Sequence, residues 1–382
     1  MRKPRVCHFA YSFFPLVGGM EEVIHSLSIS MLDQGWEPLI FTPRLRGRDN
    51  RLQVPYRVFR FQRPSSRRFG LRQILVPLLW DYFRRPFDVL HCHGVYPPGY
   101  VGASFSRLTG VPFVITPHGG DIKLTGQGFV INRRVTARIR KTLERAHAVT
   151  AISSIMRARL LALGARDERT HVVPNGVFSA QFRPSGKLYV SLQGKSPNGP
   201  PYVLYLGRLA AIKDVDILLQ AFSKIIGNEN VRLKIAGEGR EMDNLKELAK
   251  GLGIAHRVDF LGMVRGEEKV HLLQNALFFV SPRIINNLGI ANLEALSSGI
   301  PIITTKTEEA QKVIKDGENG FLVNQKSPEE LAARMDLLLN DRGLREHMSG
   351  KALATASLFD WDNIVKDYIG IYEGVMRPKK DR

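Results

Sequence analysis

Residues Ser281–Pro301 form the stretch of this chain that is best suited to chemistry. The apolar run Leu277–Val280 is typical of a buried strand, and a loop containing Gly289 follows it. A helix that begins after such a loop directs free N–H groups and the positive end of its dipole toward one place. Glu294, one turn into this helix, could bind sugar hydroxyls beside a phosphate held there. An ordinary strand–helix unit with Glu294 solvated or ion-paired is the alternative.

Three other loops in the second half also follow strand-like runs. They are Gly207–Lys213, Gly237–Gly239 and Leu261–Val264. Arg208 and Lys213 could neutralise a diphosphate, one as a planar fork and one as a point charge. Each residue alone would be read as a surface residue, but together in these loops they favour a nucleotide site, and the turn at Leu261–Val264 is suited to contact with a base.

The first half adds two loops of the same kind. Gly18 and Gly19 lie in a loop whose backbone could approach a phosphate, and His118 lies in the glycine-rich stretch Pro117–Asp121 after an apolar run. A lone histidine is usually structural, but this one follows a strand end, which favours contact with a ligand. No Cys/His metal spacing, Walker A sequence or GxGxxG motif after the first strand is found, which argues against metal hydrolases, NTPases and dehydrogenases.

Alternating strands and helices must position these loops. The pattern predicts an α/β fold with mostly parallel, doubly wound sheets, in which ligands bind beyond the carboxyl ends of the strands. The expected strands of the first half are Val6–Ala10, Leu39–Thr42, Val89–His91, Phe113–Thr116, Ala148–Ala151 and His171–Val173. Those of the second half are Tyr202–Leu206, Val231–Ala236, Val258–Phe260, Leu277–Val280, Ile302–Thr305 and Gly320–Val323.

Composition divides the chain into parts. The stretch Gln181–Pro201 is rich in Pro, Gly, Ser and Lys, which is typical of a linker. We therefore expect a first domain over 1–182, a linker over 183–200, a second domain over 201–360 and a final helix within 361–382. Cys7 and Cys92 lie in apolar runs and indicate buried thiols in a reducing compartment. No signal peptide or membrane-spanning run is expected, so we expect a cytoplasmic location, with possible peripheral contact at the inner face of the membrane.

The positive charge is concentrated in the first half. Residues 1–175 contain 27 Lys and Arg against 11 Asp and Glu, whereas the remainder contains 28 against 25. The clusters Arg44–Arg72 and Asn132–Arg145 hold much of the excess. A solvated face, a surface for anionic membrane or a phospholipid-linked substrate, and a nucleic-acid surface are the alternatives. No nucleic-acid motif accompanies the charge, so we expect no nucleic-acid partner.

Taken in order, the motifs resemble those of a known family. The sequence is similar to retaining, nucleotide-sugar-dependent glycosyltransferases of family 4 (glycosyl transferases group 1), and the resemblance runs along nearly the whole chain. It implies a GT-B fold, in which two Rossmann-like domains face each other across a cleft and a C-terminal helix crosses back to the N-terminal domain. The motifs are FPLVGGME (Phe14–Glu21), TPHGGD (Thr116–Asp121), PNGV (Pro174–Val177), YLGRLAAIK (Tyr205–Lys213), IAGEG (Ile235–Gly239), VDFLG (Val258–Gly262), GIANLEALSSGIPII (Gly289–Ile303) and DGENGFLV (Asp316–Val323).

The resemblance also implies roles for matching residues. Arg208 and Lys213 would hold the donor diphosphate, His118 would contact the transferred sugar, and Glu294 would bind the ribose hydroxyls. The resemblance further implies that the first domain binds the acceptor and the second binds the donor. It implies no bound metal and no cofactor; the UDP- or GDP-linked sugar is the donor substrate. The implied catalytic residues are His118, Arg208 and Lys213; the implied donor-binding residues are Gly18, Gly19, Gly237, Gly262, Met263, Asn286, Gly289, Ile290, Ala291 and Glu294.

One position departs from the family pattern in a way that bears on activity. The family has two glutamates with seven residues between them; Glu294 matches the second, whereas Asn286 stands at the first, followed by Asn287 and Leu288. Asn can hydrogen-bond a sugar hydroxyl but stabilises developing positive charge less well. Smaller departures occur at Asp214, Phe178 and Glu308–Glu309.

Two functions therefore remain open. The first is a hexosyltransferase that acts on an acceptor hydroxyl in polysaccharide, glycolipid or cell-envelope glycan synthesis, with a sugar or lipid-linked acceptor. The second is a catalytically weak or inactive relative that binds a nucleotide sugar or a partner. Intact Arg208, Lys213, Glu294 and His118 favour the first, and Asn286 favours the second.

Overall fold

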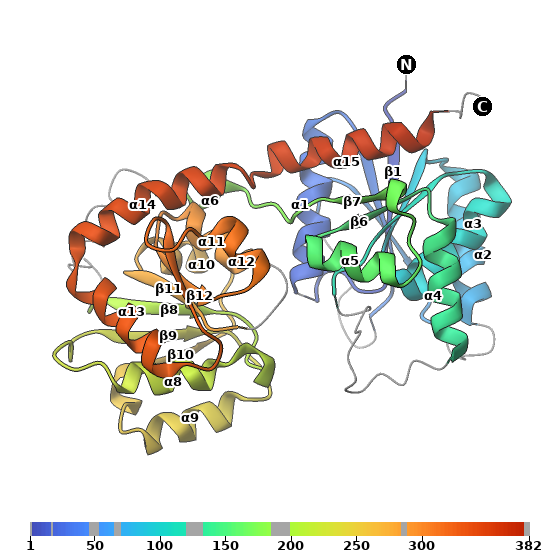
Figure 1. Ribbon diagram of the computed structural model, residues 1–382. Coiled ribbons are helices and arrows are strands. Elements are labelled where there is room, and N and C mark those ends of the chain that lie inside the picture. The colour runs from blue at the N-terminus through green and yellow to red at the C-terminus, as the bar shows by residue number, and fades with distance from the viewer. Residues whose placement is uncertain are drawn as a thin grey trace. The chain divides into compact units, whose positions relative to one another are not determined.

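The computed structural model describes residues 2–16, 18–45, 53–64, 70–119, 133–184, 199–283 and 289–377. The chain forms two compact units. Unit 1 comprises Met1–Gly176 and Trp361–Arg382, and unit 2 comprises Val177–Asp360. Each unit has a parallel sheet with helices on both faces, as Figure 1 shows, so the expected α/β architecture with two Rossmann-like domains is confirmed.

Unit 1 contains a seven-stranded sheet in the order β3-β2-β1-β4-β5-β6-β7. Its strands are β1 (Arg5–Ala10), β2 (Glu37–Pro43), β3 (Arg57–Phe61), β4 (Val89–His93), β5 (Phe113–Thr116), β6 (Ala148–Ala151) and β7 (Thr170–Val172). Its helices are α1 (Gly19–Asp33), α2 (Gly70–Arg84), α3 (Tyr100–Thr109), α4 (Arg133–Arg145), α5 (Ser154–Ala162) and α15 (Trp361–Met376), with a short π-helical turn over Val95–Gly99.

The two faces of this sheet differ in character. Cys7 and Phe9 of β1 point into an apolar core shared with α2, α3 and α4, where Cys92 also lies as a free, buried thiol. Because side chains alternate along a strand, His8 points to the opposite face. That face is covered by α1 and α15, which pack against each other, and it carries several buried polar side chains.

Strand β3 was not expected from the sequence. It lies within the basic cluster Arg44–Arg72, where charged residues obscure the alternation that indicates a strand. Phe59 and Phe61 stack on Phe41 of β2, and Arg57 forms an ion pair with the buried Asp81 of α2. Part of the cluster, residues 46–52 and 65–69, lies outside the described residues.

Unit 2 contains a six-stranded sheet in the order β10-β9-β8-β11-β12-β13. Its strands are β8 (Tyr202–Leu206), β9 (Arg232–Ala236), β10 (Val258–Gly262), β11 (Phe278–Ser281), β12 (Ile302–Thr305) and β13 (Gly320–Val323). Its helices are α6 (Ser179–Phe182), α8 (Val215–Ser223), α9 (Met242–Gly251), α10 (Gly266–Gln274), α11 (Ile290–Ser297), α12 (Glu308–Val313), α13 (Pro328–Asn340) and α14 (Arg342–Ser357), with single 3-10 turns elsewhere. Nowhere in the described ranges is a helix both long enough and apolar enough to cross a bilayer.

The chain returns to unit 1 through its last helix, α15, as expected for the C-terminal helix. Trp361 at its start is buried against Gly176, where an added Cβ would lie 2.5 Å from the indole ring. Tyr368 and Tyr372 are also buried. The units divide at Gly176, ahead of the expected domain boundary at residue 182, because α6 packs on α10 and α11 of unit 2. Residues 185–198 of the expected linker lie outside the described residues.

Candidate functional site

The candidate donor residues of unit 2 gather at the carboxyl edge of its sheet. Arg208 and Lys213 follow β8, Gly237 follows β9, and Glu294 belongs to the helix that follows β11. Gly262 ends β10, and Met263 comes next with 44% of its side chain exposed. Strands β8 and β11 are neighbours although they are not consecutive, so the strand order reverses there. Such a switch point is where open α/β sheets bind ligands.

Backbone contacts hold three of these loops together. The N–H of Gly207 donates to the carbonyl of Ala236 at 2.9 Å, and the N–H of Gly237 donates to the carbonyl of Gly262 at 2.7 Å. Gly237 has a φ of +143°, and a Cβ there would lie 1.9 Å from the carbonyl oxygen of Gly207. Only glycine fits this position, so Gly237 shapes the site by allowing the loops to approach each other. Its own N–H already donates to Gly262 and is not available to a ligand.

Three cationic side chains gather in this region. Burial, with the charges of Arg283 and Arg208, lowers the pKa of Lys213 to about 7. Burial also lowers the pKa of Arg283 to about 10. Arg283 follows β11, and a Cβ at Gly289 would lie 3.1 Å from a terminal nitrogen of its guanidinium. Arg283 was not predicted as a site residue from the sequence, although a cation directly after a strand end is a recognisable signal. Partly desolvated cations of this kind are suited to a polyanionic ligand.

Helix α11 brings its N-terminus and a carboxylate to the same edge. Gly289 is its N-cap and has no side chain with which to cap the helix. The first N–H groups of a helix lack intrahelical partners, so Ile290 and Ala291 can offer theirs to an anion. Glu294 is buried, and its Oε1 accepts from Nζ of Lys269 on α10 at 2.6 Å. Glu294 is therefore ion-paired in this structure, and Lys269 carried no sequence signal.

The loop between β11 and α11 contains the departure from the family pattern. Asn286, Asn287 and Leu288 lie outside the described residues, as do Gly120 and Asp121 of the loop after β5. The two ends of the β11–α11 loop, at Arg283 and Gly289, are described and lie close together.

In unit 1 the glycine loop stands at the start of α1. Gly18 is the N-cap of this helix, and its carbonyl accepts from the N–H of Glu22 at 3.1 Å. The carboxylate of Glu21 lies against Gly18: a Cβ added to Gly18 would lie 2.6 Å from Oε2 of Glu21. Gly19 is the first residue of the helix. A carboxylate at a helix N-terminus is favourable, and it would compete with a phosphate for the same N–H groups.

His118 follows β5, and its Nε2 lies 3.0 Å from Nδ1 of His93, the last residue of β4. Burial lowers the pKa of His118 to about 4, so the ring is neutral near pH 7. His8 and His91 lie beside His93, and one ring nitrogen of each falls within 4.8 Å of the others. The spacing of His91 and His93 by two residues indicates that they share one face of β4, but His8 joins them only because β1 pairs with β4.

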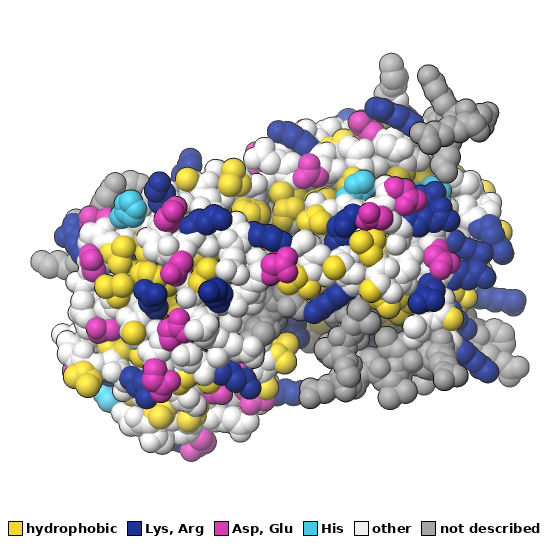
Figure 2. All heavy atoms as spheres, in the orientation of Figure 1, with side chains coloured by type: hydrophobic (Ala, Val, Ile, Leu, Met, Phe, Trp, Pro, Cys, Tyr) yellow, Lys and Arg dark blue, Asp and Glu magenta, His cyan; other side chains and the backbone are white. Residues whose placement is uncertain are grey.

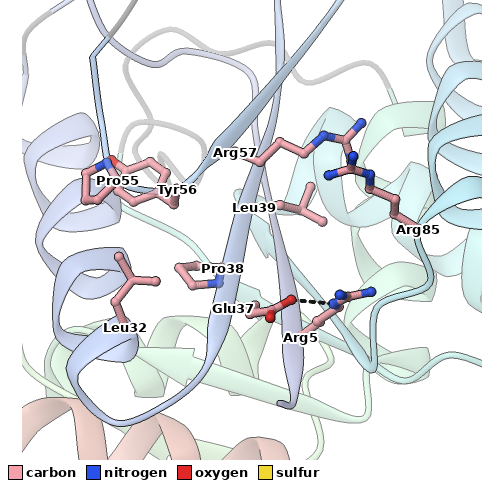
Figure 3. Close-up of a pocket in the computed structure, with 9 residues that line it drawn as sticks. All are labelled: Arg5, Leu32, Glu37, Pro38, Leu39, Pro55, Tyr56, Arg57 and Arg85. Atoms are coloured by element: carbon pink, nitrogen blue, oxygen red, sulfur yellow. Dashed lines mark hydrogen bonds and ion pairs between the residues drawn. The ribbon is translucent and has the colours of Figure 1, made fainter. Parts of the chain in front are cut away.

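A shallow cavity of about 210 Å³ lies at the opposite edge of the unit 1 sheet, where the strands begin. Figure 3 shows Arg5, Glu37 and Arg57 among its lining residues, with an ion pair between Nε of Arg5 and Oε2 of Glu37 at 2.6 Å. Arg57 also pairs with Asp81. These cations already have carboxylate partners, and the cavity is remote from the strand ends that carry His118 and Gly18.

Comparison with known families agrees with this geometry. Residues 17–180 match the family model Glycosyltransferase Family 4, and residues 192–354 match the model Glycosyl transferases group 1. The chain belongs to the family 4 (group 1) glycosyltransferases. The first match falls on the half with His118, and the second covers the cations and α11.

Relatives of this glycosyltransferase carry several different functional names. It is 29% identical over 315 residues to D-inositol 3-phosphate glycosyltransferase of Acidothermus cellulolyticus, covering 77% of this chain and 68% of that protein. It is 26% identical over 384 residues to alpha-monoglucosyldiacylglycerol synthase of Streptococcus pneumoniae, covering 95% and 85%. The solved structure of Anabaena HepE in complex with UDP is similar, with a TM-score of 0.78 and 20% identity over 97% of this chain and 100% of that one. The fold of this glycosyltransferase is therefore GT-B.

Proposed function

We propose that this glycosyltransferase moves a hexosyl unit from a UDP- or GDP-linked sugar to an acceptor hydroxyl with retention of the anomeric configuration. This transfer would serve the synthesis of a polysaccharide, a glycolipid or a cell-envelope glycan. The observation that supports this most directly is the arrangement at the carboxyl edge of unit 2. Arg208, Lys213 and Arg283 gather there with the N-terminus of α11, whose N-cap residue, Gly289, has no side chain.

These groups suit the charge that develops when the donor reacts. The bond between the anomeric carbon and the diphosphate oxygen breaks, and a bond to the acceptor oxygen forms on the same face. The proton of the acceptor hydroxyl passes to the departing diphosphate. Arg208, Lys213 and the dipole of α11 would stabilise the negative charge on that leaving group, as preorganised cations do in other sites. Such stabilisation needs no metal ion, and we propose none.

Because Oε1 of Glu294 pairs with Lys269, we propose that the second carboxylate oxygen binds the ribose hydroxyls. Burial of this carboxylate in the first two turns of α11 fixes its position relative to the helix N-terminus. We propose that Met263, which is exposed beside Gly262, contacts the base. Gly18, Gly19 and His118 would act on the donor from unit 1.

Calorimetry with UDP, GDP and ADP tests the donor site. We expect one of them to bind the wild type and to bind Lys213→Ala at least about tenfold more weakly, the scale of one lost charged hydrogen bond. Lys246→Ala is the matched control, because this lysine is exposed on α9. Binding of none of the three would contradict the donor-site assignment. A donor panel with mass-spectrometric detection of transfer and of hydrolysis then identifies the sugar.

The alternative, a catalytically weak relative, rests on Asn286. An amide can hydrogen-bond a sugar hydroxyl but does not offset positive charge at the anomeric carbon as a carboxylate does. If the natural protein is weak for this reason, Asn286→Glu will raise or redirect turnover. Loss of activity in Asn286→Glu would instead show that Asn286 belongs to a different sugar subsite.

We further propose that the acceptor is lipid-linked and that unit 1 contacts an anionic membrane surface. The outward face of α2 carries Val76, Trp80 and Phe83, which are 64%, 49% and 73% exposed. Arg84 lies 4.2 Å from the ring centre of Trp80, and the one acidic residue of α2, Asp81, is buried. Figure 2 shows Lys and Arg side chains gathered on the side of unit 1 where Figure 1 places α2, α3 and α4. Apolar and cationic residues on one helix face are typical of interfacial helices.

A further inference from the structure

Three buried histidines and a fourth, partly buried one form a polar layer on the face of the unit 1 sheet that α15 covers. His8 of β1 stands opposite His91 of β4 in the parallel register, and His93 is two residues further along β4. His8 and His91 are 0% exposed and His93 is 3% exposed. The fourth, His118, is only partly buried. It is the histidine assigned above to the transferred sugar, so the other three are buried behind a residue of the site.

Three of the four rings form one hydrogen-bonded chain. Nδ1 of His8 lies 3.0 Å from Nε2 of His93, and Nδ1 of His93 lies 3.0 Å from Nε2 of His118. Burial lowers the pKa of His8 to about 3 and of His118 to about 4, and it lowers the pKa of His93 well below its usual range. All three rings are therefore neutral, and each has one N–H and one lone pair. The protons along the chain must all point the same way.

The inner end of the chain decides the direction. Nε2 of His8 is buried and has no hydrogen-bond partner among the described residues. If the protons ran inward, this atom would carry a buried N–H with no acceptor, which is rarer and costlier in proteins than an unused lone pair. The protons therefore run outward, from Nδ1 of His8 to His93 and from Nδ1 of His93 to His118. His118 accepts at Nε2 and carries its own proton on Nδ1.

The fourth histidine, His91, is fixed by other partners. Its Nδ1 lies 2.6 Å from the hydroxyl of Tyr372 on α15, and its Nε2 lies 2.6 Å from Oγ1 of Thr116. Burial raises the pKa of Tyr372 well above its usual range, so its hydroxyl keeps its proton. Both of its nitrogens are occupied, which argues against a metal ion shared by His8, His91 and His93.

We propose that His8 and His93 are positioning residues that fix His118 as the Nδ1–H tautomer, so that His118 donates a hydrogen bond to an oxygen of the donor sugar. This inference rests on the proposed function, because it names the sugar as the acceptor of that hydrogen bond. His118 then acts as a neutral donor and not as a base. A base would need a lone pair facing the ligand, and the lone pair of His118 faces His93.

The tautomers can be observed directly in the intact protein. Two-bond ¹H–¹⁵N correlation spectra of histidine-labelled protein distinguish Nδ1–H from Nε2–H rings, and single His→Asn variants assign each ring. We expect His8, His93 and His118 to be Nδ1–H tautomers. Finding the wild-type His118 as the Nε2–H tautomer, or as a protonated ring at pH 7, would overturn the proposal without recourse to any variant's folding.

Two substitutions of His93 separate positioning from packing. Asn at this position can donate from Nδ2 near the place of Nδ1, whereas Leu fills the space without a donor. His93→Leu should release His118 toward the Nε2–H form, which a free neutral imidazole favours in water, and His93→Asn should keep it as Nδ1–H. His118 remaining Nδ1–H in a folded His93→Leu variant would overturn the positioning role.

Turnover gives the second readout. In His93→Leu, kcat for sugar transfer should fall about tenfold, the scale of one lost neutral hydrogen bond, while affinity for the nucleoside diphosphate stays within about threefold. His93→Asn should restore kcat. Absence of transfer by the wild type would contradict the proposed function, yet the tautomer spectra would still test the histidine chain. One equivalent of zinc in the purified protein, lost in His8→Leu, would overturn the chain itself.

Discussion

The Nζ atom of Lys269 lies 2.6 Å from Oε1 of Glu294, and the side chains of the two residues are only 20% and 8% exposed. The carboxylate proposed to bind the ribose is therefore held by a cation from a neighbouring helix, α10. This ion pair holds Glu294 next to the N-terminus of α11. It makes Lys269 part of the proposed donor site, although the lysine lies outside every sequence motif.

Substitution of Lys269 should therefore affect both stability and ribose recognition. Lys269→Gln leaves a buried carboxylate without its cation, which typically costs about 3 kcal/mol of unfolding free energy. We expect lower stability in urea denaturation, and a smaller preference for UDP over its 3′-deoxyribose analogue in calorimetry. Lys312→Gln is the control, because Lys312 pairs with acidic residues on the more exposed α12. An unchanged ribose preference in folded Lys269→Gln would contradict this role.

Donor binding should take up a proton near Lys213. Its pKa is about 7 in the free protein, against a usual 10.5, and an anionic ligand favours the charged form and raises that pKa. Between about pH 7 and pH 10, binding then protonates the amine, so affinity falls with rising pH by up to about tenfold per unit. Below pH 7 the amine is already charged and this dependence disappears. Calorimetry in buffers of different ionisation enthalpy measures the uptake.

The same experiment tests the role of Arg283. Arg283→Gln removes a neighbouring cation and so raises the pKa of Lys213, which moves the onset of pH dependence upward, while overall diphosphate affinity falls. Arg283→Lys keeps the charge and should shift the onset less. An onset that stays near pH 7 in Arg283→Gln would show that the two side chains are not electrostatically coupled.

Gly237 should not tolerate a side chain. Its φ of +143° is strained for other residues, and a Cβ would overlap the carbonyl of Gly207 at 1.9 Å. We expect Gly237→Ala to lower the unfolding free energy by roughly 3 kcal/mol or more and to weaken diphosphate binding, because the loop carrying Arg208 must move. Gly251→Ala on α9 is the control. It has open space around it and should stabilise by up to about 1 kcal/mol. Equal stability of the two variants would contradict the close approach.

The outward face of α2 should govern membrane binding. Trp80→Ser combined with Phe83→Ser should lower partitioning onto phosphatidylglycerol vesicles by about tenfold or more, because two large apolar side chains no longer enter the interface. Ile226→Ser combined with Leu358→Ser removes two other exposed apolar side chains, which belong to unit 2, and should have no effect. Binding should weaken at high salt and be absent on phosphatidylcholine vesicles. Equal partitioning of both double variants would exclude α2 as the contact.

Much of this protein is determined by local sequence. Strand–loop–helix units such as β11 followed by α11 were predicted because apolar periodicity and glycine punctuation act within a few residues. The parallel sheets follow from the same alternation, and with them the placement of Arg208, Lys213 and Glu294 at strand ends. Strand β3 escaped prediction because the arginines of Arg57–Phe61 interrupt the alternation, and they are accommodated by a distant carboxylate, Asp81.

Only the tertiary structure decided which distant residues meet. Lys269 and Glu294 are joined because α10 and α11 pack side by side. The charge of Arg283 lowers the pKa of Lys213 because the neighbouring strands β8 and β11 lead into the loops that carry them. The histidine chain exists because β1 lies beside β4, which brings His8 within 3.0 Å of His93 across 85 residues of sequence. Sequence periodicity specifies which face of an element is buried. Hydrogen bonds and Coulomb interactions depend on separation in space, and strand order sets that separation.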